Sequence, residues 1–223
     1  MNEVTITVRG SHETRIAPER AIAHVTARAD GPARGVVVER IAALAAPVRA
    51  DLTERKTAGA VAEWSSQRVS VWSERPWNAE GRQLDLVHHA SVEFTATFTD
   101  FMLLSDWLNG VAENDGLQVG SVEWELSPET RARVEREVAA AAVTVAVERA
   151  TAYASAIGRG TVTPLEIADP GLLTGHGDPG AGPQPLRMAR SAMAMDAGGS
   201  PAVDFQPDDL VVSASVEARF TAR

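Results

Sequence analysis

Alternation of apolar and polar residues is the feature that most constrains this chain of 223 residues, because it recurs from one end to the other. A period of two places every second side chain on one face of a β-strand, and it therefore predicts half-buried strands. Gly10 is expected to end the first of them. The segments with this pattern are 3–9, 21–29, two runs within 60–98 joined by a polar connection at 75–81, 117–126, 161–168 and 210–221.

Three other segments change to a helical period, in which apolar residues recur every three or four positions. These segments are 33–50, 100–113 and 128–157. Pro47 is expected to shorten the first helix. The third is the clearest, because Ser127 is a good N-cap, Pro128 suits the first helical position and Gly158 suits the C-cap. Its predicted inner face, rich in small side chains, consists of Val134, Val138, Ala141, Val145 and Ala152.

These segments follow one another in the order ββαββαβαββ. Adjacent strands joined by short connections favour antiparallel pairing. We therefore expect an α+β fold, in which one antiparallel β-sheet carries about three helices packed on it, one of them long and Ala-rich. The whole chain, 1–223, is expected to be a single domain with a long flexible loop at about 169–208, where Gly, Pro, Met and Ser residues show little periodicity.

Composition argues against several classes of function. The net charge is −9 and the only lysine is Lys56, so the chain has no basic stripe with which to bind nucleic acid or an anionic membrane. The absence of cysteine excludes disulfides, thiolate metal sites and a cysteine nucleophile. Arginine and alanine nearly without lysine are the composition expected of a GC-rich bacterial genome.

The expected location follows from the apolar segments. Residues 1–6 lack the basic, apolar and small-residue pattern of an export leader. No apolar run approaches the length of a membrane span. We therefore expect a cytoplasmic protein without a membrane span, or one of the envelope or periplasm if a natural leader has been removed.

No combination of residues predicts an active site. His88 and His89 are adjacent, but neighbours on a strand point to opposite faces, so the two cannot easily share one metal ion. The segment 177–180 lacks the strand-to-helix turn and the lysine of a phosphate-binding loop, and no Gly-x-Ser-x-Gly elbow is present. We therefore expect a protein that is not an enzyme and has no catalytic residues, metal or cofactor.

Tryptophan is the most unusual part of the composition, with five residues beside a single tyrosine. Packing between sheet and helices is one interpretation, and a protein-contact patch is the other, because tryptophan is enriched at interface anchors. Trp77 follows a proline in a turn and is expected to be the most exposed. The segment 169–208 adds apolar residues that a disordered linker seldom has. The candidate interaction surface consists of Trp64, Trp72, Trp77, Leu186, Met188, Met193, Met195 and Phe205.

Four stretches of the chain, taken in order, resemble the SIMPL domain family, a bacterial domain of unknown function. They are Ile6–Gly10 followed by Ile16–Ala21, Ala90–Phe94 running into Asp100, Gly116–Glu129 with the Ala-rich helix to Gly158, and Leu210–Val216. The chain departs from the usual pattern at Glu19, at Val87–His89 and at Asp209. The resemblance implies no catalytic residues. It also implies kinship with exported proteins, among them an immunogenic periplasmic protein that assembles into a ring, and with a distant animal relative named for binding a signalling kinase.

Together these observations predict a non-enzymatic binding or assembly protein. We expect self-association into a homo-oligomer through the 169–208 loop and the Trp64–Trp77 region, because a sheet with open edges favours assembly. One alternative is an adaptor for a specific protein partner, and another is an enzyme with an unrecognised site.

Overall fold

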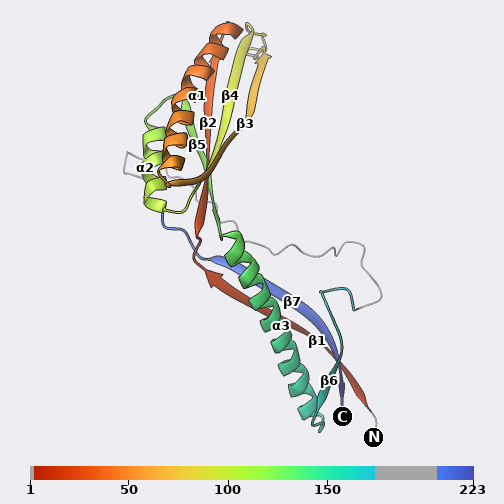
Figure 1. The fold of residues 1–223 in the computed structure, drawn as a ribbon. Helices are drawn as coiled ribbons and strands as arrows, with labels where there is room; N and C mark the ends of the chain where they lie inside the picture. The colour runs from red at the N-terminus through yellow and green to blue at the C-terminus, as the bar shows by residue number, and fades with distance from the viewer. Residues whose placement is uncertain (1–2, 174–204) are drawn as a thin grey trace. The chain divides into compact units, whose positions relative to one another are not determined.

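A computed structural model of the chain describes residues 3–173 and 205–223, and it contains the predicted elements in the predicted order (Figure 1). The strands are β1 (Val4–Ile16), β2 (Arg20–Gly31), β3 (Val61–Glu74), β4 (Val87–Phe98), β5 (Leu117–Glu125), β6 (Val162–Ala168) and β7 (Leu210–Ala222). The helices are α1 (Arg34–Thr57), α2 (Phe101–Ala112) and α3 (Pro128–Ala156). All strand pairs are antiparallel, so the α+β class is confirmed.

The strands form two sheets where one was expected. One sheet has the order β1-β7-β6, and the other has the order β3-β4-β2-β5. Alternation could not reveal this division, because a period of two fixes which side chains share a face and leaves the choice of partner strand open. β1 pairs with β7 along its whole length, from Val4 opposite Ala222 to Ile16 opposite Leu210.

Contacts between the elements divide the described chain into two compact units. The first unit contains β1, α3, β6 and β7, and the second contains β2, α1, β3, β4, α2 and β5. The single-domain boundary of 1–223 stays a prediction.

In the first unit, α3 lies along one face of the three-stranded sheet (Figure 1). Its buried residues recur every four positions and are Val134, Val138, Ala142, Ala146, Ala150 and Ala154. The predicted inner face was correct at the first two of these, whereas Ala141 and Val145 are only half-buried and Ala152 is exposed. The reason is that contact follows a single ridge of residues spaced by four, whereas the prediction mixed spacings of three and four.

Gly10 lies inside β1, which corrects the prediction that it would end the strand. A Cβ atom on Gly10 would come 2.7 Å from the amide nitrogen of Ala146 and closer still to the carbonyl oxygen of Ala142. The missing side chain therefore lets the backbones of β1 and α3 touch, which is a recognised role of glycine within a strand.

The predicted ends of α3 are confirmed. The Ser127 hydroxyl accepts a hydrogen bond from the amide of Thr130 at 3.2 Å, and Pro128 opens the helix. Gly158 follows the helix with a φ of 72°, a left-handed conformation that favours glycine.

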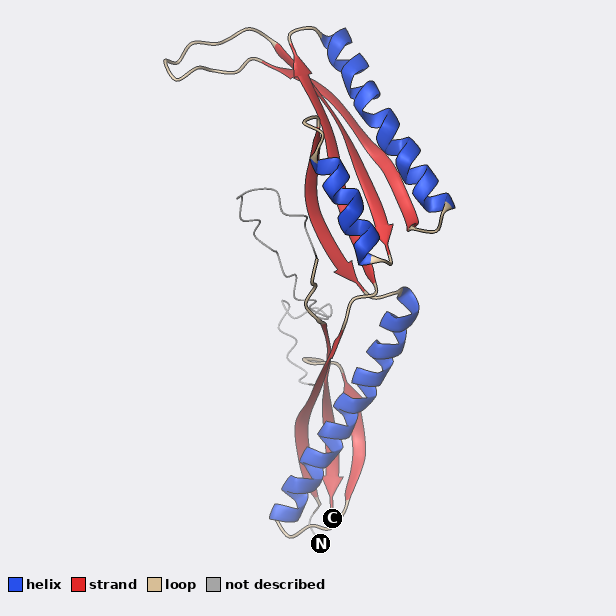
Figure 2. Ribbon diagram, turned by 90° about the vertical axis from the view of Figure 1, so that its left-hand side faces the viewer, coloured by secondary structure: helices blue, strands red, loops and turns tan. Residues whose placement is uncertain are grey.

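In the second unit, α1 and α2 cover the same face of the four-stranded sheet (Figure 2). α1 continues through Pro47 to Thr57, so the prediction that this proline would shorten the helix was wrong. A proline removes one backbone hydrogen bond and crowds the preceding turn. Val48 and Leu52 are buried beyond it, and their burial offsets that cost.

α2 begins at a side-chain cap. One carboxylate oxygen of Asp100 accepts hydrogen bonds from the amides of Met102 at 2.9 Å and Leu103 at 3.3 Å. The cap satisfies amides that have no partner within the helix.

Candidate functional site

The connection between β3 and β4, residues 75–86, is held together by its own backbone, and we call it the hairpin apex. Trp77 and Gln83 pair across it as an isolated antiparallel bridge. The amide of Leu84 donates to the carbonyl of Pro76 at 2.8 Å. The apex therefore continues the hairpin beyond the two named strands. Figure 2 shows it as the long loop that extends past the end of the sheet.

The tip of the apex is built around Asn78. Its side-chain oxygen accepts hydrogen bonds from the amides of Glu80 at 3.1 Å and Arg82 at 2.8 Å. Its carbonyl accepts a third from the amide of Gly81 at 3.1 Å, and Gly81 has a φ of 73°. This local bonding is what asparagine and glycine supply in tight turns, and it fixes the backbone that carries Trp77.

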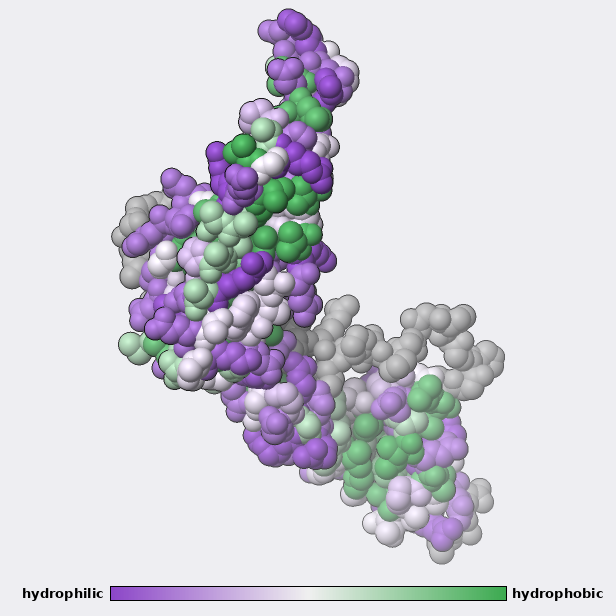
Figure 3. All heavy atoms as spheres, turned by 45° about the horizontal axis from the view of Figure 1, so that its top comes forward, coloured by the Kyte–Doolittle hydropathy of each residue, from purple (hydrophilic) through white to green (hydrophobic). Residues whose placement is uncertain are grey.

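Exposed apolar side chains gather on this hairpin. They are Val69, Trp72, Trp77, Leu84 and Leu86, with exposed fractions of 58, 45, 66, 45 and 38%. Figure 3 shows hydrophobic residues, in green, reaching the surface of this unit among hydrophilic ones. We call these five residues the hairpin apolar group. Single exposed apolar residues are ordinary, but a concentration of them marks a surface for binding.

The three tryptophans that the sequence placed in one surface divide into two kinds. Trp64 is partly buried and packs against the core of the second unit. Trp72 and Trp77 are exposed, and Trp77 is the most exposed of the three, as expected. The difference arises because Trp64 lies opposite the buried Ala96 on the helix-covered face, whereas Trp72 lies opposite His89 on the other face.

The 169–208 part of the candidate surface is only partly visible. Leu186, Met188, Met193 and Met195 lie outside the described residues. Phe205 is described, and its ring packs edge-on against Trp124 with 5.9 Å between ring centroids. Phe205 thus contributes to the packing of the second unit.

The imidazole of His89 stacks on Trp72, with ring centroids 5.2 Å apart and planes inclined by 19°. Its Nε2 atom is buried and lies 3.4 Å from a carboxylate oxygen of Glu74 without forming a hydrogen bond. His88 contacts a different partner, because its Nδ1 atom lies 2.6 Å from the hydroxyl of Ser73. The two histidines therefore serve separate cross-strand pairs.

Two kinds of site are absent from the part of the chain that the structure describes. No three or more His, Asp or Glu side chains there are grouped so that they could hold a metal ion. Among the same residues, no helix is both long enough and apolar enough to cross a membrane.

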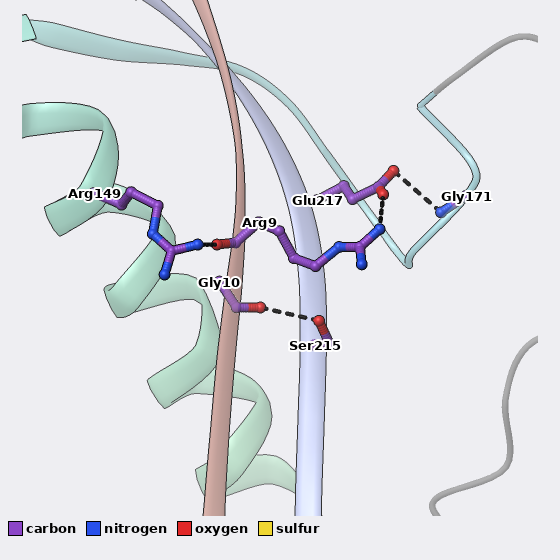
Figure 4. A network of polar contacts seen from close by, with 6 residues as sticks. All are labelled: Arg9, Gly10, Arg149, Gly171, Ser215 and Glu217. Carbon is purple, nitrogen blue, oxygen red and sulfur yellow. Dashed lines mark hydrogen bonds and ion pairs between the residues drawn. The ribbon is translucent and has the colours of Figure 1, made fainter. Parts of the chain in front are cut away.

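Besides the two histidine contacts of the second unit, a polar cluster around Glu217 lies on the first unit (Figure 4). The guanidinium of Arg9 donates to one carboxylate oxygen of Glu217 at 2.7 Å, and the amide of Gly171 donates to the other at 3.1 Å. These hydrogen bonds, that of Arg9 above all, lower the pKa of Glu217 below its ordinary value. An ionised carboxylate with both oxygens engaged is poorly suited to proton transfer. The cluster therefore anchors the residues that follow β6 to β7.

Sequence reasoning missed part of the exposed apolar surface. The predicted connection at 75–81 ended too early, because β4 begins only at Val87 and leaves Leu84 and Leu86 on the apex. A second exposed apolar set on or beside β6 was also missed, and it consists of Leu165, Ile167 and Leu172. No local signal marked the first pair, because Leu84 and Leu86 continue the period of two whose buried residues in β4 start at Ala90.

Two antiparallel sheets, each covered on one face by helices, define an α+β protein whose described polar clusters are engaged in structural contacts. The model of the SIMPL family, described as a protein of unknown function (DUF541), matches residues 6–220, and the chain belongs to this family. The resemblance noted in the sequence is thereby confirmed. Among proteins with curated descriptions, a search finds no match.

Proposed function

We propose that this protein is a non-enzymatic assembly protein whose copies associate through the hairpin apex and the hairpin apolar group. The observation that carries the proposal is Trp77, whose side chain is 66% exposed although its backbone is held by the bridge to Gln83 and the hydrogen bonds of Asn78. An aromatic side chain on a preorganised turn loses little conformational entropy on binding. Tryptophan is also among the residues that most often dominate the energy of an interface.

The surroundings of Trp77 support the same function. Trp72 lies on the face of β3 away from the helices, whereas Val69 lies on the helix-covered face. Leu84 and Leu86 lie on the returning part of the hairpin, so exposed apolar side chains come before and after Trp77 along the chain. Residues around an anchor exclude water from it and strengthen its contribution. An interface that includes Trp77 would cover side chains that water now contacts.

The polar clusters support a role without catalysis. The carboxylate of Glu217 is engaged by Arg9 and Gly171, and the ring of His89 is covered by Trp72. A general acid or base needs access to a substrate proton. Neither group offers that access in this arrangement.

The test is the oligomeric state of wild type and of Trp77→Ser across a range of concentrations, measured by light scattering and sedimentation. Loss of an anchoring tryptophan should raise the dissociation constant by about thirtyfold or more. Met102→Ser on α2 is the matched control, because Met102 is 77% exposed and lies outside the hairpin. This control should leave association unchanged.

Wild type that stays monomeric at every concentration would refute self-assembly. Equal association of wild type and Trp77→Ser would instead refute the assignment to the apex. If wild type is monomeric and yet captures one protein in a Trp77-dependent manner, the adaptor alternative replaces the proposal.

A further inference from the structure

β3 is an edge strand with one side open. The four-stranded sheet has the order β3-β4-β2-β5, and within the described residues β4 is the only strand that pairs with β3. Half of the backbone amides and carbonyls of such a strand point away from the sheet and can pair with another chain. β3 spans Val61–Glu74 and contains no proline.

The edges of the three-stranded sheet are protected in ways that β3 is not. At one edge, the guanidinium of Arg149 donates a hydrogen bond to the carbonyl of Arg9 in β1 at 2.7 Å. At the other edge, β6 is short and contains Pro164, which lacks an amide donor. Side-chain blocking and proline are two means by which proteins prevent pairing at an edge.

The regular part of β3 has a clear midpoint. Its register against β4 is irregular between Ser65 and Arg68, and it then runs without interruption from Arg68 to Glu74. The residue halfway along this segment is Val71. A second strand that pairs with the whole regular segment in antiparallel orientation, about a two-fold axis, would therefore place Val71 opposite its own copy.

The charges of β3 fit this register. Its only charged residues are Glu63, Arg68 and Glu74. Arg68 lies three positions before Val71, and Glu74 lies three positions after it. Across the axis, Arg68 of each copy would therefore face Glu74 of the other copy, which gives two such pairs in each dimer. Both are exposed, with side-chain exposures of 73% and 60%, and both lie on the face of the sheet away from the helices. Opposite charges in facing positions stabilise antiparallel pairs and fix their register.

We propose that β3 of one copy pairs with β3 of a second copy in antiparallel orientation, with the two-fold axis at Val71. This proposal rests on the proposed self-assembly and names its geometry. The two four-stranded sheets join edge to edge into one continuous sheet. Trp72 of each copy faces Ser70 of the other, and Trp77 of each copy extends beyond Arg68 of the other.

Charge reversal tests the register. Arg68→Glu alone places two acids opposite two acids, and Glu74→Arg alone places two bases opposite two bases. Each variant by itself should dimerise about tenfold more weakly than wild type. An equimolar mixture of the two variants restores both opposite-charge pairs, so native mass spectrometry should show the heterodimer in excess over either homodimer.

Thermal unfolding of each variant is the control for folding, since Arg68 also lies 3.6 Å from Glu93 within its own chain. A mixture that yields only the statistical share of heterodimer would overturn the register. The double variant Arg68→Glu/Glu74→Arg is a second test of the register. Its homodimer again places opposite charges in both facing pairs, so its dimer affinity should match that of wild type.

Spin labels give an independent measurement, because the chain has no cysteine and a single introduced one is labelled alone. Positions 69 and 73 each lie two residues from an axis at Val71. The distance between the two labels of a dimer should therefore be the same for Val69→Cys as for Ser73→Cys, with a component of about 13 Å along the strands. Val71→Cys should give the shortest separation. Unequal separations at the first two positions would refute the pairing.

The failure of this proposal can be distinguished from the failure of the proposed function. Wild type that is monomeric at all concentrations contradicts both. Self-association that depends on Trp77 but shows neither heterodimer preference nor equal label separations contradicts only the β3 pairing.

Discussion

Replacing Gly10 by alanine should strongly destabilise the first unit. In most strands this change would stabilise the protein, because alanine has less conformational freedom to lose on folding. Here the new Cβ atom would lie 2.7 Å from the amide nitrogen of Ala146 and 2.9 Å from its Cβ atom. The nearest atoms are backbone atoms of α3, which cannot rotate away as a side chain could. β1 and α3 must therefore separate.

The expected magnitude follows from that separation. Overpacking typically costs about 1–3 kcal/mol, and contact with backbone places this substitution at the upper end, near 3 kcal/mol. For a unit of about 100 residues, this loss lowers the melting temperature by more than about 10 °C. Parting β1 from α3 also loosens the packing of the buried alanines that follow Ala142 along the helix.

The assay is urea and thermal unfolding followed by the helical signal in far-ultraviolet circular dichroism. Gly160→Ala is the matched control, because a Cβ atom on Gly160 meets no atom within 4 Å. The control should lie within about 0.5 kcal/mol of wild type, as surface substitutions usually do. A Gly10→Ala protein as stable as this control would refute the idea that β1 and α3 are in backbone contact.

Three further predictions concern stability. Asp100→Ala removes the cap of α2 and should cost about 1 kcal/mol in urea unfolding, whereas Asp100→Asn should retain most of the stability. Gly110→Ala, at an exposed position inside α2 where a Cβ atom meets no atom within 4 Å, should add about 0.5–1 kcal/mol. The pKa of Glu217 is lowered in the folded state, chiefly by Arg9, so its contribution is complete above the ordinary value of 4.5 and is lost as the pH falls through the folded pKa. In a urea titration between neutral pH and about pH 3, Glu217→Gln should therefore lose less stability on acidification than wild type; an unchanged acid dependence would contradict the role of this carboxylate.

Much of the fold could be predicted because its signals are local. The ends of α3 are set by Ser127, Pro128 and Gly158, whose preferences depend on the backbone within one turn. The strands are set by alternation, which is also local. These features gave every element, in order.

The errors arose where distant residues decide the outcome. Gly10 has the same local preferences as a glycine that ends a strand, and only the approach of α3 distinguishes the two cases. Pro47 disfavours a helix locally, and only the burial of Val48 and Leu52 against the sheet offsets this. The partition of strands between two sheets likewise depends on pairings between distant segments.

The candidate site was predictable in part for the same reason. Trp77 was expected to be exposed because a turn residue beside a proline has few neighbours, and its exposure is confirmed. Trp64 and Trp72 lie on one strand and have similar local surroundings in the sequence. The difference in their exposure depends on the register of β3 against β4 and on which face of the sheet the helices cover.

The pairing of β1 with β7 has a consequence for how the protein is made. Ile16 and Leu210 face each other in the sheet, yet ribosomes add residues at about 5–20 per second, so roughly ten seconds or more separate their synthesis. All strands of the other sheet lie between Arg20 and Glu125, and they are complete long before β7 emerges. During that interval β1 is a strand without its partner on a nascent chain, and an unpaired strand edge of this kind is prone to aggregate.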